Sequence, residues 1–156
     1  MSMSHSPLAA LALSLAPVLA LCVPSVSQVR TQFSIDEGFQ FPSPAFAYDE
    51  VRSRVIFALP TGQICEWDGS NWAIALPSLP GQPLAAVYDP VRRRSFFSVL
   101  GATAARLVEY DGITVIDHGA IPLFATELTA DTARGRLIAI GIDTASTAGV
   151  VEWDGA

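Results

Sequence analysis

The sequence contains no lysine, and all nine of its basic residues are arginine. Fifteen acidic residues give a formal net charge of −6 at neutral pH. The longest basic run is the three arginines at 92–94, and the other arginines lie singly or two residues apart. Nucleic-acid binding depends on a concentrated positive patch that contacts phosphates. We therefore expect no nucleic-acid partner.

Histidine and cysteine are scarce, with two of each. His5 and Cys22 lie in the first 27 residues, so the remainder has only His118 and Cys65. One histidine and one cysteine cannot form a usual zinc site, and a lone cysteine has no intrachain disulfide partner. A cysteine in an apolar strand is most often a small buried hydrophobic residue. We expect no metal, no cofactor and no catalytic residue.

Asp, Glu, Lys and Arg are absent from residues 1–27. An apolar run over 8–23 is followed by the small residues Ser25 and Ser27, which predicts a signal-peptide helix cleaved before Gln28. Pro17 interrupts the run, which is shorter than the roughly 20 residues of a spanning helix. The alternatives are an uncleaved anchor and lipidation at Cys22, although Leu21 is large for lipoprotein processing. We expect a secreted or periplasmic protein with no membrane contact beyond the leader.

Segments with helical periodicity are also missing after the leader, and a repeat is found instead. An aspartate is followed by arginines three and five residues later in 47–59, 87–100 and 129–141. Successive copies start 40 and 42 residues apart. The residues of this motif are Asp49, Arg52, Arg54, Asp89, Arg92, Arg94, Asp131, Arg134 and Arg136.

A second motif, Glu–aromatic–Asp–Gly, recurs every 43 residues. Since two independent motifs recur at about the same interval, they indicate a true repeat. The residues that follow the glutamate are Trp67, Asp68, Gly69, Tyr110, Asp111, Gly112, Trp153, Asp154 and Gly155.

Each repeat is predicted to form four short antiparallel strands, which gives an all-β fold. Asp49 is expected to accept hydrogen bonds from the turn that follows it. Gly135 suggests that the residue between the two arginines needs a positive φ. Asp-Gly predicts a tight turn. We also expect one partly exposed ion pair per repeat, joining Arg54 to Asp68 and the equivalent residues, and burial of the aromatic residue between sheets.

The wording "YDxxRxR" followed by "EWDGxxW" resembles the kelch-like repeats of secreted bacterial β-propellers. The resemblance covers about residues 43–155 and implies four-stranded propeller blades. The double glycine usual in kelch repeats is absent. We expect a signal peptide over 1–27, lead-in or closing strands over 28–42, and repeats near 43–82, 83–123 and 124–156. Two complete repeats and a third without its last strand predict an incomplete propeller.

Two functions are compatible with this sequence. One is an exported module that binds protein or carbohydrate through the loops between strands, with residues 141–149 as the expected contact surface. The other is a truncated fragment of a propeller enzyme, of carbohydrate-active or oxidase type, whose catalytic residues are missing. A non-functional remnant of a longer gene is a third possibility. Open sheet faces would also favour self-association.

Overall fold

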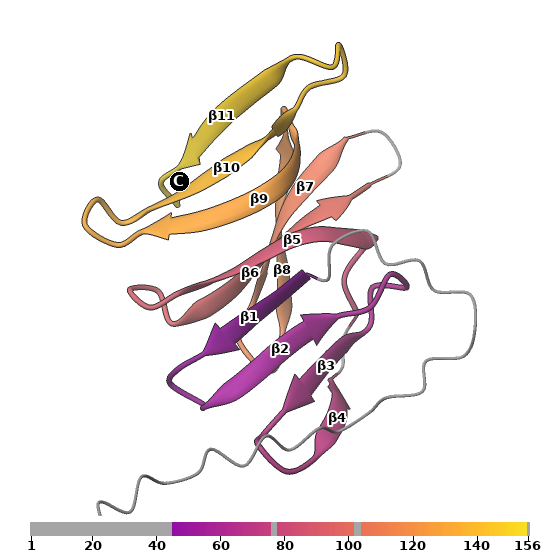
Figure 1. Cartoon of the computed structure of the whole chain (residues 1–156), viewed down its shortest axis with the longest axis vertical. Coiled ribbons are helices and arrows are strands. Elements are labelled where there is room, and N and C mark those ends of the chain that lie inside the picture. The colour runs from indigo at the N-terminus through magenta and orange to yellow at the C-terminus, as the bar shows by residue number, and fades with distance from the viewer. Residues whose placement is uncertain (1–44, 76–77, 102–103, 156) are drawn as a thin grey trace, which may run out of the picture. The chain divides into compact units, whose positions relative to one another are not determined.

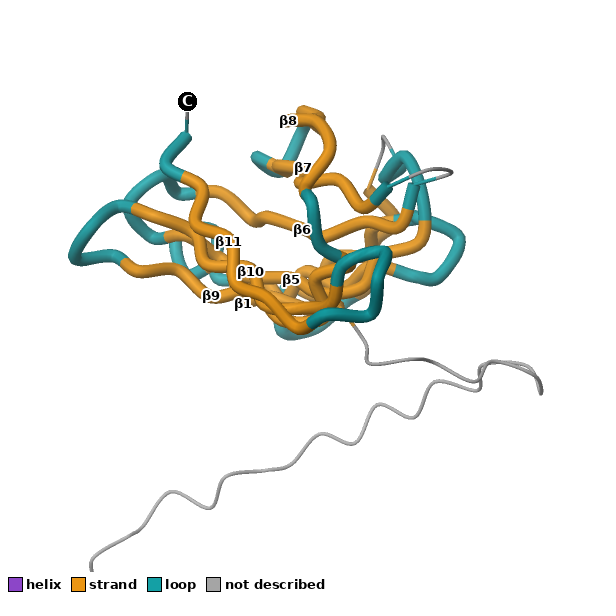
Figure 2. Tube along the Cα trace, turned by 90° about the horizontal axis from the view of Figure 1, so that it is seen from above, coloured by secondary structure: helices purple, strands orange, loops and turns teal. Residues whose placement is uncertain are grey.

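The computed structural model describes residues 45–75, 78–101 and 104–155. The predicted signal peptide and the lead-in over 28–42 lie outside these ranges. The described residues form eleven strands joined by turns and loops, with no helix among them (Figures 1 and 2). The prediction of an all-β protein with four-stranded antiparallel sheets is therefore confirmed for two sheets, and a third sheet has three strands.

Each sheet is an antiparallel meander, because its strands pair in the order in which they occur in the sequence. The first sheet contains β1 (Ala45–Asp49), β2 (Arg54–Ala58), β3 (Ile64–Trp67) and β4 (Trp72–Ala75). The second contains β5 (Gln82–Asp89), β6 (Arg94–Leu100), β7 (Ala105–Tyr110) and β8 (Val115–Ile121). The third contains β9 (Phe124–Asp131), β10 (Arg136–Ile142) and β11 (Ala148–Trp153).

The second sheet packs between the other two through two hydrophobic clusters. Ile56 and Ile64 of the first sheet pack with Phe97 and Tyr110 of the second. On the opposite face of the second sheet, Phe96 packs in a cluster that includes residues of β10 and β11. Five consecutive residues of β6 are therefore buried, a pattern typical of a strand covered on both faces.

Strand alternation explains how one short segment serves both clusters. Successive side chains of a strand point to opposite faces of its sheet. Phe96 and Phe97 are both completely buried, but they belong to different clusters. The first and third sheets have only one such covered face among the described residues. Their other faces carry large exposed apolar side chains, including Tyr48, Ile74 and Val150.

Candidate functional site

The Asp–Arg–Arg motif forms the turn that joins the first two strands of each sheet. Asp49 and Asp89 end β1 and β5, and each accepts hydrogen bonds from backbone amides two and three residues later. In the third sheet, Asp131 accepts a bond from the Arg134 amide. These bonds satisfy the turn's donors, as the sequence predicted.

The slot between the two arginines has a positive φ in all three turns. The angle is 52° at Ser53, 59° at Arg93 and 65° at Gly135. This left-handed conformation is costly for residues other than glycine. Gly135 therefore indicated a real backbone requirement, which the other two repeats meet with a serine and an arginine.

The second arginine of each repeat forms an ion pair, as predicted, but its partner is the glutamate that precedes the aromatic residue. Arg54 pairs with Glu66 at 3.3 Å, and Arg94 pairs with Glu109 at 3.1 Å. The prediction that Asp68 and Asp111 are the partners was therefore wrong. Their carboxylates instead accept backbone amides of their own Asp-Gly turns. In the third sheet Arg136 pairs with Glu152.

The physical reason lies in the competition for the aspartate. A carboxylate that caps its own turn has its oxygens directed at local amides, without a long side chain having to be ordered. For both Asp68 and Asp111, hydrogen bonds from turn amides are the leading cause that lowers the carboxyl pKa. The glutamate one residue before the aromatic is longer and projects from the strand face, where it meets the arginines.

The first arginine of the motif links neighbouring sheets. Arg52 binds Asp49 and Glu66 of its own sheet, and its guanidinium lies 5.6 Å from the ring centre of Tyr110 in the second sheet. Arg92 repeats this arrangement toward the third sheet, where its guanidinium lies 5.1 Å from the ring centre of Trp153. Such contacts between cations and aromatic rings are favourable, the more so when partly desolvated.

The same arginines also contact the Asp-Gly turn of the following sheet. Arg92 donates to the backbone oxygen of Asp154 in this turn, and also to that of Gly135 in the Asp–Arg–Arg turn of the same sheet, both at 2.8 Å. A side chain at Gly155 would come within 2.9 Å of this guanidinium, and one at Gly112 would collide with Arg52. At Gly69, by contrast, an added Cβ would meet no atom within 4 Å. In the second and third sheets, an arginine from the preceding sheet therefore occupies the space beside the turn glycine.

Glu66 ties the first sheet to the second through a buried hydrogen bond. The Tyr110 hydroxyl donates to Glu66 Oε1 at 2.9 Å. Burial, followed by the neighbouring Glu66 carboxylate, raises the pKa of Tyr110 well above its usual value. The predicted burial of the repeat aromatics is confirmed for Tyr110, which is 1% exposed. Trp153 packs between sheets and is partly buried, whereas Trp67 lies on the first sheet's other face, with its ring tilted against that of Trp72 at 5.3 Å between ring centres.

His118 and Cys65 are two further side chains of types that could serve in catalysis or metal binding. His118 Nε2 forms a hydrogen bond with Glu109 Oε2 at 2.8 Å. The centre of the His118 ring lies 4.7 Å from that of the Trp153 ring. Cys65 is a free, half-buried thiol whose pKa is raised by burial, the opposite of what a nucleophile requires. Within 45–75, 78–101 and 104–155, no three of His, Cys, Asp and Glu are placed to hold a metal ion. The charged residues of the repeat thus form ion pairs and hydrogen bonds that hold the turns and sheets together.

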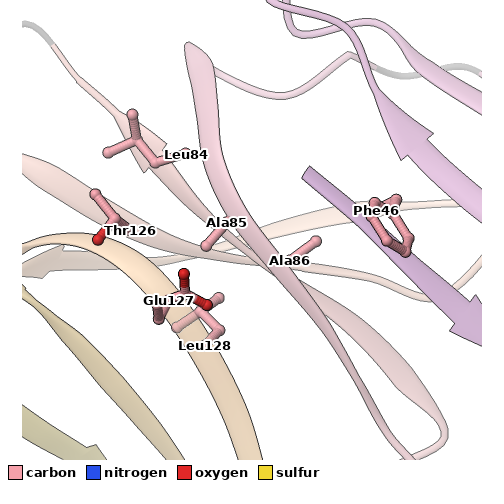
Figure 3. A pocket seen from close by; sticks show the side chains of 7 residues that line it. All are labelled: Phe46, Leu84, Ala85, Ala86, Thr126, Glu127 and Leu128. Carbon is pink, nitrogen blue, oxygen red and sulfur yellow. The ribbon is translucent and has the colours of Figure 1, made fainter. Parts of the chain in front are cut away.

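A hollow of about 280 Å³ lies where the first strands of the three sheets meet (Figure 3). Figure 3 shows Phe46 of β1 on one side of the β5 alanines and Thr126 and Glu127 of β9 on the other. The Phe46 ring is 61% exposed, and both β9 residues are exposed. The full lining consists of Phe46, Leu84, Ala85, Ala86, Thr126, Glu127 and Leu128.

This hollow combines an aromatic face, a hydroxyl and a carboxylate over a small apolar floor. Ala85 and Ala86 leave room because their side chains are short. Glu127 has no ion pair with any described residue, unlike Glu66, Glu109 and Glu152 of the repeat motif. It is thus an acid available to a ligand. Sequence reasoning missed these residues because Glu127 and Phe46 belong to no repeated motif and are far apart in the chain.

A second hollow of about 270 Å³ reaches the loop expected from the sequence to be a contact surface. Thr144 of that loop lines it together with apolar residues near Ile121 and Phe124. The loop itself is closed by two backbone hydrogen bonds, from the Asp143 amide to the Thr147 oxygen and from the Ser146 amide to the Asp143 oxygen. Since its lining offers one hydroxyl and no charge, we consider the first hollow the better candidate site.

Neither a known protein family nor a curated protein matches this chain. Among the described residues there is no helix long and apolar enough to cross a membrane.

Proposed function

We propose that this chain is an exported, kelch-like β-propeller module that binds carbohydrate in the hollow bounded by β1, β5 and β9. Three observations support the propeller interpretation: the meander in every sheet, the repeated turn chemistry, and the repeated arginine contact from one sheet to the next. Export rests on the leader, residues 1–27.

One observation carries the binding proposal: exposed Phe46 and Glu127, which has no ion pair among the described residues, line opposite sides of the same hollow. Sugars present apolar C–H faces that pack on aromatic rings, and hydroxyls that bond to carboxylates and threonine. The volume of about 280 Å³ suits one or two sugar units rather than a large cofactor. Catalysis is not required by this geometry, because paired acids in unlike environments are not brought together there.

Calorimetric titration with a panel of soluble oligosaccharides tests this proposal. We expect Glu127→Gln and Phe46→Ala each to weaken the affinity at least tenfold, about 1.4 kcal/mol. Glu50→Gln and Ile113→Ala are matched controls, because they change an exposed acid and a 76% exposed apolar residue outside the hollow. Binding that these four variants leave equal, or no binding across the panel, would refute a carbohydrate site.

A further inference from the structure

Among the described residues, no sheet covers the outer face of the first sheet or the outer face of the third. Within the chain, neighbouring sheets are joined by an arginine of one sheet that contacts the aromatic residue and Asp-Gly turn of the next. One outer face carries such a turn and the other carries such an arginine. The first sheet presents the Trp67–Gly69 turn without an arginine on it. The third sheet presents Arg134, the equivalent of Arg52 and Arg92, without an aromatic turn opposite it. Equivalent residues of the three repeats can therefore be compared at faces that a neighbouring sheet covers and at faces that no described sheet covers.

The arginines make the difference visible. The side chains of Arg52 and Arg92 are 27% and 23% exposed, whereas that of Arg134 is 52% exposed. All three bond the aspartate of their own turn. Arg134 also bonds Glu152, just as Arg52 bonds Glu66. The third arginine is thus held in the same arrangement as Arg52, but no described residue lies where the next sheet lies for Arg52.

Apolar residues at equivalent positions show the same contrast. Ile64 of β3 and Leu107 of β7 are 0% and 3% exposed because the following sheet covers them. Their equivalent on β11, Val150, is 63% exposed. Next to it on the same face of the third sheet, Ile140 is 46% exposed. This face has the apolar side chains of a covered face, but no sheet of the described residues covers it.

The opposite end of the stack shows the complementary half. Tyr110, covered by the preceding sheet, is 1% exposed, while its equivalent Trp67 remains partly exposed. On the same face of the first sheet, Tyr48 and Ile74 are 55% and 62% exposed. The turn glycine Gly69 has an empty space where Gly112 receives Arg52.

We infer that the two faces bind each other in two copies of this chain, with Arg134 of one copy on the Trp67–Gly69 turn of the other. Arg134 would lie over the Trp67 ring and donate to the turn's backbone, as Arg92 does at Trp153 and Asp154. Glu152 would face Trp67 as Glu66 faces Tyr110. The contact is head-to-tail, so each copy uses two different surfaces.

Two copies joined in this way place six of the described sheets in one series, and closed propellers usually have about four to eight blades. A head-to-tail contact that closes after two copies forms a discrete dimer, and one that does not close forms open chains. The two proposals share Phe46, which lies on the same face of the first sheet as Tyr48 and Ile74. Glu127 belongs to the carbohydrate site alone and Arg134 to the contact between copies alone, so Glu127→Gln and Arg134→Ala distinguish them.

Sedimentation velocity of the full chain tests the inference. We expect a dimer of twice the 16.5 kDa chain mass. Arg134→Ala removes the guanidinium that would contact the turn, and Gly69→Asn fills the space beside the turn that the guanidinium would occupy. Each variant should raise the dimer dissociation constant at least tenfold. Arg106→Ala and Gly119→Asn are matched controls. Gly119 has the same φ of 97° and the same open surroundings as Gly69, and Arg106 is an exposed arginine paired within the second sheet.

A mixture of the two interface variants provides the decisive result. The Gly69→Asn chain keeps an intact Arg134, and the Arg134→Ala chain keeps an intact Gly69 turn. At a concentration where each variant alone is monomeric, the mixture should form a one-to-one complex through one intact contact. A monomeric wild-type chain, or variants that associate as the wild type does, or a mixture that stays monomeric, would overturn the inference. Circular dichroism of each variant separates loss of contact from loss of fold.

Discussion

At the residue scale, one arginine in each repeat makes both local and long-range contacts. Arg92 binds the aspartate of its own turn, lies over the ring of Trp153 and donates to two backbone oxygens of the third sheet. The planar guanidinium has five donors in a fixed fork, so it can make several such bonds at once. A lysine, as a flexible point charge, could not replace it, which gives a physical reason for arginine at this motif position.

The buried turn aspartate has a measurable consequence for stability against acid. Burial acts to raise the pKa of Asp49, but the amide and guanidinium of Arg52 hold it below its ordinary value of 3.8. The unfolded state therefore binds protons at higher pH than the folded state, and the stabilising contribution is lost as pH falls below about 4. We expect chemical denaturation to show a falling free energy of unfolding below that pH.

Asp49→Asn isolates this contribution, because the amide oxygen still accepts the turn's hydrogen bonds but cannot titrate. The variant should be less stable than wild type at pH 7 by about 1.5–3 kcal/mol, the range for a hydrogen bond to a charged group. The difference should shrink as pH falls through the folded-state pKa. A difference that stays constant between pH 7 and pH 2 would show that Asp49 is not the titrating group.

At the scale of the element, the Asp-Gly turn combines a backbone requirement with a contact. Gly112 has a φ of 99°, a conformation that side chains rarely adopt, and Arg52 also occupies the space beside it. Gly119 has nearly the same φ of 97° but nothing nearby. The two glycines thus share one source of strain and differ in the second.

Comparing Gly112→Ala with Gly119→Ala therefore measures what the arginine contact adds. Both variants should lose about 1 kcal/mol or more from the strained backbone. We expect Gly112→Ala to lose roughly 1 kcal/mol beyond this, because Arg52 must leave a position fixed by Asp49 and Glu66. Equal losses in urea denaturation would mean that the guanidinium shifts without cost.

At the scale of the whole described unit, the sheets form a series in which each contacts its neighbours. Stability in such repeat arrays is close to a sum of unit and neighbour terms. The second sheet contributes to both clusters, so its inner strands should be the last to open.

Hydrogen exchange followed by mass spectrometry tests this gradient. We expect the slowest exchange in β6 and β7, and exchange at least tenfold faster in β4, whose side chains are mostly exposed. In the dimer inferred above, Arg134→Ala should speed exchange in β3 and β11, the strands that bear the two open faces. Uniform exchange across the three sheets would instead indicate a single cooperative unit.

Local chemistry determined much of this protein before any folding is considered. The spacing of the motifs indicates the repeat, Gly135 indicates a left-handed turn position, and strand periodicity separates Glu66 from Trp67. These features depend on residues within one hairpin, where backbone geometry leaves few choices. The sequence also predicted an arginine pair across β2 and β3, though with the wrong acid.

Only the tertiary structure decided which contacts cross between sheets. Three such contacts are Arg92 against Trp153, Arg52 beside Gly112, and Phe46 with Glu127 around one hollow. Each joins residues about 60 to 80 positions apart. No local rule relates such residues, because their distance depends on how the sheets pack. Packing therefore determined which acids pair with arginines, and it placed Glu127, which has no ion pair among the described residues, at the hollow.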